Sequence, residues 1–347
     1  MLVESPPEQR AAPAPAPRNR RVMRAVGLPL SVVILLLVAA ASIAIGAKEL
    51  SLEQVWHGLF HASDTYGDVV VADRLSRTLL GVLAGAALGL AGAVLQALTR
   101  NPLADPGLLG INAGASAAVV TAITFFGVTS LSGYVWFAFC GAAAVGALVW
   151  FLGGSRSATP VRLVLAGTAI TAALFGYLQA VMILDDAALG KMRFWTVGSL
   201  AAADDATIGQ VLPFLLAGTA LALSLARPLN AMAMGDDTAK ALGANLNRTR
   251  ALSMLAATVL CGAATAACGP IVFVGLMVPH AVRSFTGPDL RWILPYAAIL
   301  SPVLLLGADV LGRVVARPAE LQVGIVTAVI GGPLFIFLVR RRRTAQL

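Results

Sequence analysis

The feature that most constrains this chain is a succession of apolar runs, each about 20 residues long. An α-helix of 17 to 25 apolar residues is long enough to cross a bilayer. The sequence supports ten such segments, of which the one at 275–287 is short. They are 25–47, 75–98, 108–128, 133–154, 162–184, 208–227, 250–270, 275–287, 292–311 and 322–340. We therefore expect an all-α integral membrane protein with about ten transmembrane helices.

Composition agrees with this class. Of the 347 residues, 58% are hydrophobic and only 12% are charged, whereas soluble domains carry roughly 25% charged residues. Aromatic residues make up 6% and glycines number 34, which favours closely packed helices over a β-barrel with aromatic girdles. Gly81, Gly85 and Gly89 repeat a GxxxG spacing that lets a neighbouring helix approach closely.

The distribution of basic residues predicts the orientation. The net charge is +8, which in a soluble chain could indicate nucleic acid; here the positive-inside rule explains it, and no nucleic-acid partner is expected. With a cytoplasmic N-terminus, 18 of the 25 Lys and Arg residues fall inside and 7 outside. The sequence predicts a multi-pass membrane protein with both termini cytoplasmic.

One transmembrane domain is predicted, over 25–340. Residues 1–24 are Pro/Ala-rich and then basic, typical of a disordered cytoplasmic tail. Residues 341–347 form a basic cytoplasmic C-terminus. The longest cytoplasmic connection, 228–250, contains an Asp236-Asp237 pair that resembles a helix N-cap and a glycine, Gly243, that could end the helix. A short helix at this face would suit docking of a partner; a solvated loop is the alternative.

A shaped break separates the second and third spans at residues 100–115, RNPLADPGLLGINAGA. Pro102 and Pro106 forbid a continuous helix and push Asn101 and Asp105 out of helical geometry. Non-helical backbone at membrane depth survives where it is buried in protein or lines a water-filled cavity. A gate and an ordinary tight turn both fit this pattern.

Basic residues at the predicted outer face run against the positive-inside rule and therefore require an explanation. Arg74 and Arg77 lie three residues apart on one helical face, and Arg313 ends the ninth span. Arginines there could pair with carboxylates of a partner protein, or could snorkel or pair locally. Asp309 at i−4 offers Arg313 such a local pair.

The sequence contains little that predicts a catalytic or metal site. His57 and His61 have the i, i+4 spacing of a metal pair but lack further ligands, so no metal site is predicted. The three cysteines lie in apolar runs and imply no disulfide framework. No catalytic residues stand out, and no chain of Asp, Glu or His crosses the membrane, which argues against an ion-coupled carrier. No Walker A motif is present either, so ATP-driven transport requires another chain.

Eight motifs, in order, resemble the permease subunits of bacterial type II ABC importers (FecCD-type) for iron(III)-siderophores, haem and vitamin B12. The likeness runs from about residue 30 to 340. The motifs are RLSR (74–77), AGAVLQALTRNPLADPGLLGINAGA (91–115), RLVLAG (162–167), WTVGSL (195–200), AKALG (239–243), GPIVFVGLMVPHAVR (269–283), ADVLGR (308–313) and VGIVTAVIGGPLF (323–335). The family usually has proline where Ser76 and Gln322 stand.

The resemblance implies a non-catalytic translocation subunit of the bacterial cytoplasmic (inner) membrane. Its partners would be a second permease in a homodimer or heterodimer, two ATPase subunits that use ATP and Mg, and an extracytoplasmic substrate-binding protein. The fifth and tenth helices would line the pathway, and this chain itself would bind no cofactor. An iron(III)-siderophore is the expected substrate; vitamin B12 or haem is the alternative within the family, and an ion-coupled secondary transporter or a membrane scaffold lies outside it.

The resemblance also assigns roles to residues of this sequence. The cytoplasmic gate would comprise Asn101, Leu103, Thr159 and Pro160. ATPase coupling would use Gly235, Ala239, Leu242 and Gly243. Docking of the binding protein would use Arg74, Arg77 and Arg313.

Overall fold

The computed structural model describes residues 17–61, 65–128, 130–153, 160–201 and 203–343. These residues form fourteen α-helices and one short 3-10 helix, η1, with no strand among them. The elements are α1 (Pro17–Ala44), α2 (Leu52–Phe60), α3 (Tyr66–Thr99), η1 (Pro106–Leu109), α4 (Ile111–Phe126), α5 (Leu131–Leu152), α6 (Pro160–Leu184), α7 (Asp186–Trp195), α8 (Asp205–Ser224), α9 (Ala226–Ala233), α10 (Asp236–Ala241), α11 (Leu246–Cys268), α12 (Val274–Thr286), α13 (Leu290–Val315) and α14 (Val323–Arg343).

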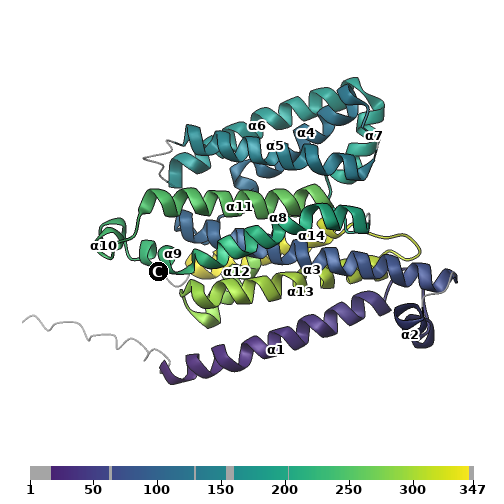
Figure 1. Ribbon diagram of the computed structural model, residues 1–347, viewed down its shortest axis with the longest axis horizontal. Helices are drawn as coiled ribbons and strands as arrows, with labels where there is room; N and C mark the ends of the chain where they lie inside the picture. The colour runs from purple at the N-terminus through teal and green to yellow at the C-terminus, as the bar shows by residue number, and fades with distance from the viewer. Residues whose placement is uncertain (1–16, 62–64, 129, 154–159, 202, 344–347) are drawn as a thin grey trace, which may run out of the picture.

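Each of the ten segments expected to span the membrane coincides with a helix. Among the described residues, seven helices (α1, α3, α5, α6, α8, α11 and α13) are long and apolar enough to cross a bilayer, while α4 and part of α14 are shorter apolar helices. The tenth is α12, with 13 residues. The long helices run roughly side by side (Figure 1), so the all-α membrane architecture is confirmed.

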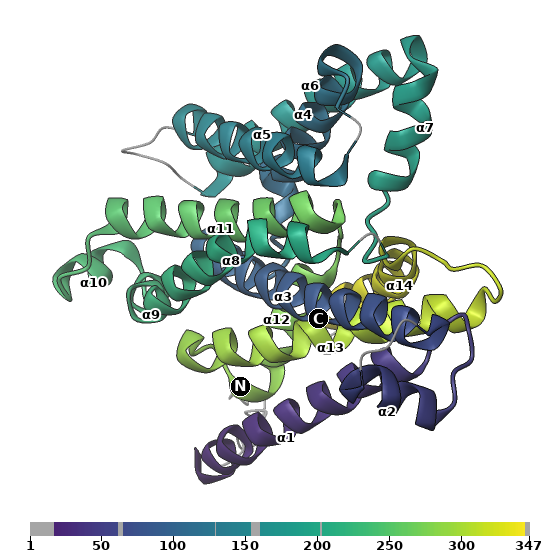
Figure 2. The same cartoon turned by 45° about the vertical axis from the view of Figure 1, so that its right-hand side comes forward.

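The short helices lie at the two ends of the bundle. In both views α9, α10 and the start of α1 lie at one end, and α2 and α7 lie at the other (Figures 1 and 2). Since α3 runs between these ends, we call the first the Arg100 side and the second the Arg77 side. These two names locate a residue at one end of the bundle without stating which end faces the cytoplasm.

Helix α3 forms the centre of the core. Its most apolar window is 78% buried, and it packs against α11, α12 and α13. Close approach depends on glycine: a Cβ at Gly92 would lie 1.9 Å from the carbonyl oxygen of Gly275, and one at Gly85 would lie 2.6 Å from Cα of Pro302. The GxxxG repeat therefore does what its spacing predicts, bringing α3 against the backbone of α13.

Helices at the periphery keep apolar surface exposed. The apolar window of α1 is only 11% buried and that of α6 only 17%. Leu36 and Leu37 on α1, and Val161, Leu165 and Phe175 on α6, are among the exposed side chains. Such continuous apolar surface faces lipid or a further protein chain.

The first helix starts earlier than predicted, and helices occupy much of the predicted coupling loop. Helix α1 begins at Pro17, inside the segment predicted as a disordered tail over 1–24, because proline suits a first helical position and arginine is a good helix former. Residues 1–16 lie outside the described part. The connection 228–250 is largely helical, with most of α9, all of α10 and the start of α11 within it.

Candidate functional site

The break between α3 and α4 is built as the prolines predict. Helix α3 ends at Thr99, and Arg100 takes a left-handed conformation with φ of 52°. The Asn101 side chain then accepts a hydrogen bond from the Leu103 amide at 3.0 Å. Asp105 caps η1 by accepting from the Gly107 amide at 2.8 Å. The chain turns through fixed local hydrogen bonds before α4 begins.

The predicted gate residues lie in two places. Asn101 is exposed and Leu103 is half-buried at the Arg100 side. Pro160 is the first residue of α6, and Thr159 lies outside the described residues. A gate role for the four residues stays a prediction.

The predicted coupling residues surround α10. Gly235 precedes the helix with φ of 107°, and Gly243 follows it with φ of 80°. Both values lie in the left-handed half of the map, which glycine adopts without strain. Ala239 is buried, and Leu242 is exposed. The short helix predicted here is present, and Gly243 ends it.

Asp236 does not cap α10 as the sequence suggested. The N-cap is Gly235, and the aspartate lies in the first turn. Its carboxylate instead bridges two arginines, accepting from Arg100 and, at 2.7 Å, from Arg250. Burial acts to raise the pKa of Asp236, but the hydrogen bonds and charges of the two arginines outweigh it and lower that pKa.

Two of the three arginines predicted for docking share one aspartate at the Arg77 side. Asp309 on α13, fully buried, receives Arg77 at 2.7 Å and Arg313 at 3.0 Å. Arg77 also pairs with Glu320 at 2.6 Å. The local Arg313–Asp309 pair is therefore confirmed, and it belongs to a larger network.

Arg74 and Arg313 tie the end of α1 to this network. Arg74 donates to the carbonyl oxygens of Ile43, Ala44 and Lys48 at 2.6 to 3.0 Å. Arg313 donates to the carbonyl and the hydroxyl of Ser42, both at 2.9 Å. All three arginines predicted for docking are buried and bonded inside the chain.

More accessible charge lies beside them. The Arg317 side chain is 34% exposed and pairs with the Glu49 carboxylate at 2.8 Å. Sequence reasoning did not single out Arg317, Glu49 or Glu320, and it gave Asp236 only a capping role. The only sequence signal for the charged contacts of these residues was charge near a helix end, which occurs at many positions. Ser76, where the family usually has proline, donates to Asp205 at 2.8 Å and so ties α3 to α8.

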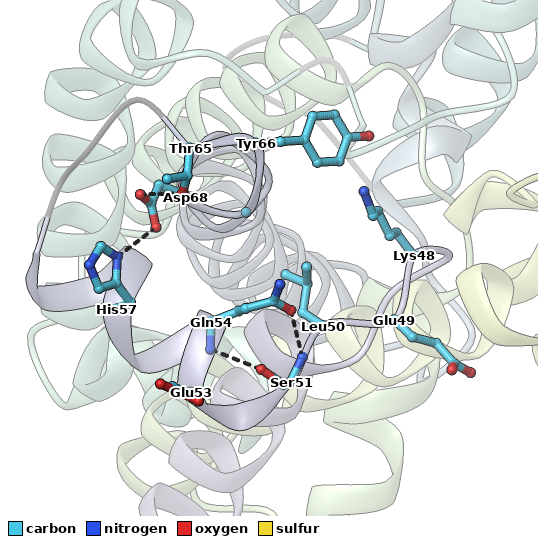
Figure 3. Close-up of a pocket in the computed structure, with 11 residues that line it drawn as sticks. Lys48, Glu49, Leu50, Ser51, Glu53, Gln54, His57, Thr65, Tyr66 and Asp68 are labelled. Carbon is cyan, nitrogen blue, oxygen red and sulfur yellow. Dashed lines mark hydrogen bonds and ion pairs between the residues drawn. The ribbon is translucent and has the colours of Figure 1, made fainter.

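An open cavity of about 660 Å³ lies between α2 and the start of α3 at this side. The Lys48 ammonium lies 3.5 Å from the centre of the Tyr66 ring. His57 Nδ1 lies 3.2 Å from Asp68 (Figure 3). Within the described ranges, no group of three or more His, Cys, Asp or Glu side chains is arranged to hold a metal ion.

The chain resembles known transport proteins along almost its whole length. A family model described as the FecCD transport family matches residues 34–341. The ferric enterobactin transport system permease protein FepD of Escherichia coli is 47% identical over 325 residues, covering 92% of this chain and 97% of that protein. The hemin transport system permease protein HmuU of Yersinia pestis is 38% identical, covering 94% and 98%.

Two further comparisons agree. The Fe(3+)-citrate import system permease protein YfmD of Bacillus subtilis is 38% identical, covering 95% of this chain and 98% of that protein. Among solved structures, an inward-facing conformation described as a metal-chelate type ABC transporter is similar with a TM-score of 0.80 and 29% identity. That match covers 92% of this chain and 99% of the other.

Proposed function

The chain belongs to the FecCD transport family and is a permease subunit of an iron-siderophore-type ABC importer, and from this premise we propose that its substrate is an iron(III)-siderophore complex. One observation carries the choice of substrate: 47% identity, over 92% of the chain, with a permease of ferric enterobactin transport. Haem is the second candidate, since a hemin permease is 38% identical.

In this proposal the chain performs no covalent chemistry. Two partner ATPase subunits hydrolyse ATP, and the permease alternates between an outward-open and an inward-open state. Such a cycle needs a segment that opens, a surface that receives force and a rigid body between them. In this proposal the broken segment at Asn101 opens, the short helix α10 receives the force, and the well-buried α3 and α11 form the rigid body.

We assign the Arg100 side to the cytoplasm. Helices α9 and α10 lie there together with the arginine-rich start of α1 (Figure 1), and basic residues favour the cytoplasmic face. The ATPase subunits would then contact α10, where Leu242 offers an exposed apolar side chain between Gly235 and Gly243. Coupling through these residues rests on the family resemblance.

A second permease subunit would cover α6. This helix is the fifth of the ten spans and exposes Val161, Leu165 and Phe175. Association of helices in a membrane depends on packing between such surfaces. Both a homodimer and a heterodimer with a similar permease satisfy this requirement.

The extracytoplasmic binding protein would dock on the Arg77 side. Direct pairing of its carboxylates with Arg74, Arg77 or Arg313 stays a prediction, and their burial in this chain counts against it. Arg317 is the more accessible arginine on this side. The buried arginines would then hold the docking surface in shape rather than contact the partner.

Uptake of labelled iron tests the substrate. Iron-starved cells with and without this gene are supplied with radioactive ferric siderophores, including a catecholate, and cell-associated iron is counted. The expected result is uptake that requires the gene and that persists under an uncoupler while ATP is maintained. Collapse with the uncoupler would instead indicate a secondary transporter, and uptake of haem or cobalamin alone would reassign the substrate.

A further inference from the structure

Three charged residues from three separate elements meet at the Arg100 side. Arg100 follows α3 directly, Asp236 opens α10 and Arg250 lies in the first turns of α11. The Asp236 carboxylate accepts from Arg100 through one oxygen and from Arg250 through the other. This carboxylate therefore bridges the end of α3 to α11 through α10.

Arg100 is held from two directions. Its guanidinium donates to Asp236 and also, at 2.7 Å, to the carbonyl oxygen of Met232 on α9. Its backbone is left-handed, a conformation that costs a non-glycine residue free energy and persists where surrounding contacts fix it. Asn101, the first residue of the break, is its covalent neighbour, so a displacement of Arg100 moves the break directly.

Arg250 supplies the fixed end of the bridge. Its side chain is only 15% exposed, and α11 is among the most buried helices, with 72% of its apolar window buried. Helix α10, by contrast, has six residues and makes few contacts beyond α9 and α11. A force that moves α10 therefore acts on Arg100 through one carboxylate oxygen of Asp236, while Arg250 restrains the other oxygen.

An isolated exposed ion pair would carry little force, because such pairs contribute little and exchange with water. Two features separate this bridge from such a pair: one carboxylate receives two guanidinium groups, and one of those groups also bonds to the backbone of α9. The neighbouring aspartate shows the contrast. Asp237 is fully exposed and lies 3.8 Å from Lys240 on its own helix, so it connects no second element.

We propose that Asp236 is the positioning residue that couples movement of α10 to the gate at Asn101, through its bridge to Arg100 and Arg250. The inference rests on the proposed function, since it requires an ATPase that moves α10. It adds to that function the specific residues through which the movement reaches the break.

The test compares Asp236→Asn with the matched control Asp237→Asn in the complete complex of permeases and ATPase subunits in proteoliposomes. All variants carry Ala104→Cys as a reporter inside the break, where the native side chain is buried, and Cys140→Ser to remove an exposed thiol. The readout is the rate at which a membrane-impermeant maleimide labels residue 104, with and without ATP and vanadate. This readout needs no knowledge of the cargo.

The control background should show a labelling rate that changes with nucleotide state. Asp236→Asn is expected to reduce that change about fivefold or more, while ATP hydrolysis and co-purification of the ATPase persist. Arg100→Gln should reproduce the defect. The double variant Asp236→Asn/Arg100→Gln should be no worse than either single variant, because residues that act through the same contact have non-additive effects. Asp237→Asn should behave as the background.

Three results would overturn the proposal: an unchanged response in Asp236→Asn, loss of ATPase co-purification in that variant, or failure of both Asp236→Asn and Arg100→Gln to accumulate as folded protein. The second would make Asp236 a docking residue, and the third would make the bridge a requirement for folding only. Failure of the proposed function is a separate outcome, because the background complex itself would then show no nucleotide response.

Discussion

Arg77 and Arg313 lie on different helices yet share one carboxylate, that of Asp309, at 2.7 and 3.0 Å. Asp309 is fully buried, and the Arg313 side chain is 1% exposed. Two guanidinium groups and one carboxylate leave an excess positive charge, which Glu320 balances through its contact with Arg77 at 2.6 Å. The end of α1 joins the same group through Ser42.

Replacement of Asp309 by asparagine is expected to destabilise the fold strongly. The substitution conserves shape but leaves two arginines buried without their shared anion, and breaking a buried pair in this way costs about 3–5 kcal/mol. The measurement is the thermal unfolding midpoint of the purified protein in detergent. Glu320→Gln serves as control, because the Glu320 carboxylate is partly exposed and its pair with Arg77 should contribute less than about 1 kcal/mol. Equal shifts in both variants would contradict the assignment of Asp309 as the main anion of this network.

Charge reversal at Arg317 should weaken docking without unfolding the chain. Arg317→Glu places a negative charge on accessible surface at the Arg77 side, and we expect affinity for the binding protein to fall about tenfold at low salt. Arg248→Glu, an exposed residue at the opposite side, changes net charge equally and should leave affinity unchanged. Affinity is measured at two salt concentrations, and an Arg317 variant that binds like the control at low salt refutes this docking surface.

Reversal at Arg74 or Arg313 offers the complementary comparison. The family resemblance predicts weaker docking and weaker ATPase stimulation in both variants. Because both side chains are buried and bonded within the chain, we expect a lower unfolding midpoint to accompany that loss. Weaker docking with an unchanged midpoint would instead favour direct contact with the partner.

The fold could be predicted to a large extent because its determinants are local. The length of an apolar run reports whether a helix can cross a bilayer, and all ten predicted spans coincide with helices. The short helices α2, α7 and α9 escaped prediction since they lack such a run and owe their formation to caps and packing at the bundle ends. Ser51, for example, caps α2 through a reciprocal bond with Gln54.

The candidate site, like the fold, could be predicted only where its determinants are local in the sequence. Pro102 and Pro106 encode the break locally, and the Arg313–Asp309 pair is visible at i+4 spacing. The partners of Arg100 and Arg77 are 136 and 232 residues away in the sequence. No spacing rule reaches that far, so the bridge at Asp236 and the shared role of Asp309 emerge only in three dimensions.

Substitution at Gly92 tests the contact between α3 and α12. A Cβ there would lie 1.9 Å from a backbone oxygen of Gly275, and backbone cannot move aside as a flexible side chain can. Gly92→Ala is therefore expected to destabilise by about 1–3 kcal/mol, seen as a lower unfolding midpoint. Gly307→Ala on α13 is the control: nothing lies within 4 Å of its Cβ position, so stability should hold or rise.

Acid should weaken the junction of α9 and α13 through Asp289. Hydrogen bonds from Arg291 hold the pKa of this aspartate down to about 2, against an ordinary value of 3.8. Asn230 on α9 also donates to its carboxylate at 2.7 Å. A lowered folded-state pKa gives stability that is present above the unfolded value and lost as pH falls through the folded one.

Asp289→Asn should consequently cost about 1 kcal/mol at neutral pH, after allowance for solvent screening. The difference in unfolding midpoint from the unmodified chain should shrink as pH falls from 4 towards 2. Midpoints recorded across this range make the check, with exposed Asp237→Asn expected to show no difference at any pH. A difference in unfolding midpoint that stays constant with pH would assign the effect of Asp289 to hydrogen bonds that do not depend on its charge.

Cross-linking distinguishes the surface of α6 from that of α1. Leu165 on α6 and Leu37 on α1 are exposed by 64% and 65%, so this chain alone gives no reason for them to differ. If a second permease covers α6 while lipid covers α1, Leu165→Cys should form covalent dimers with a bis-maleimide in native membranes, in a Cys140→Ser background, and Leu37→Cys should not. Equal yields would mean that neither surface is a specific interface, because collision in the bilayer treats both helices alike.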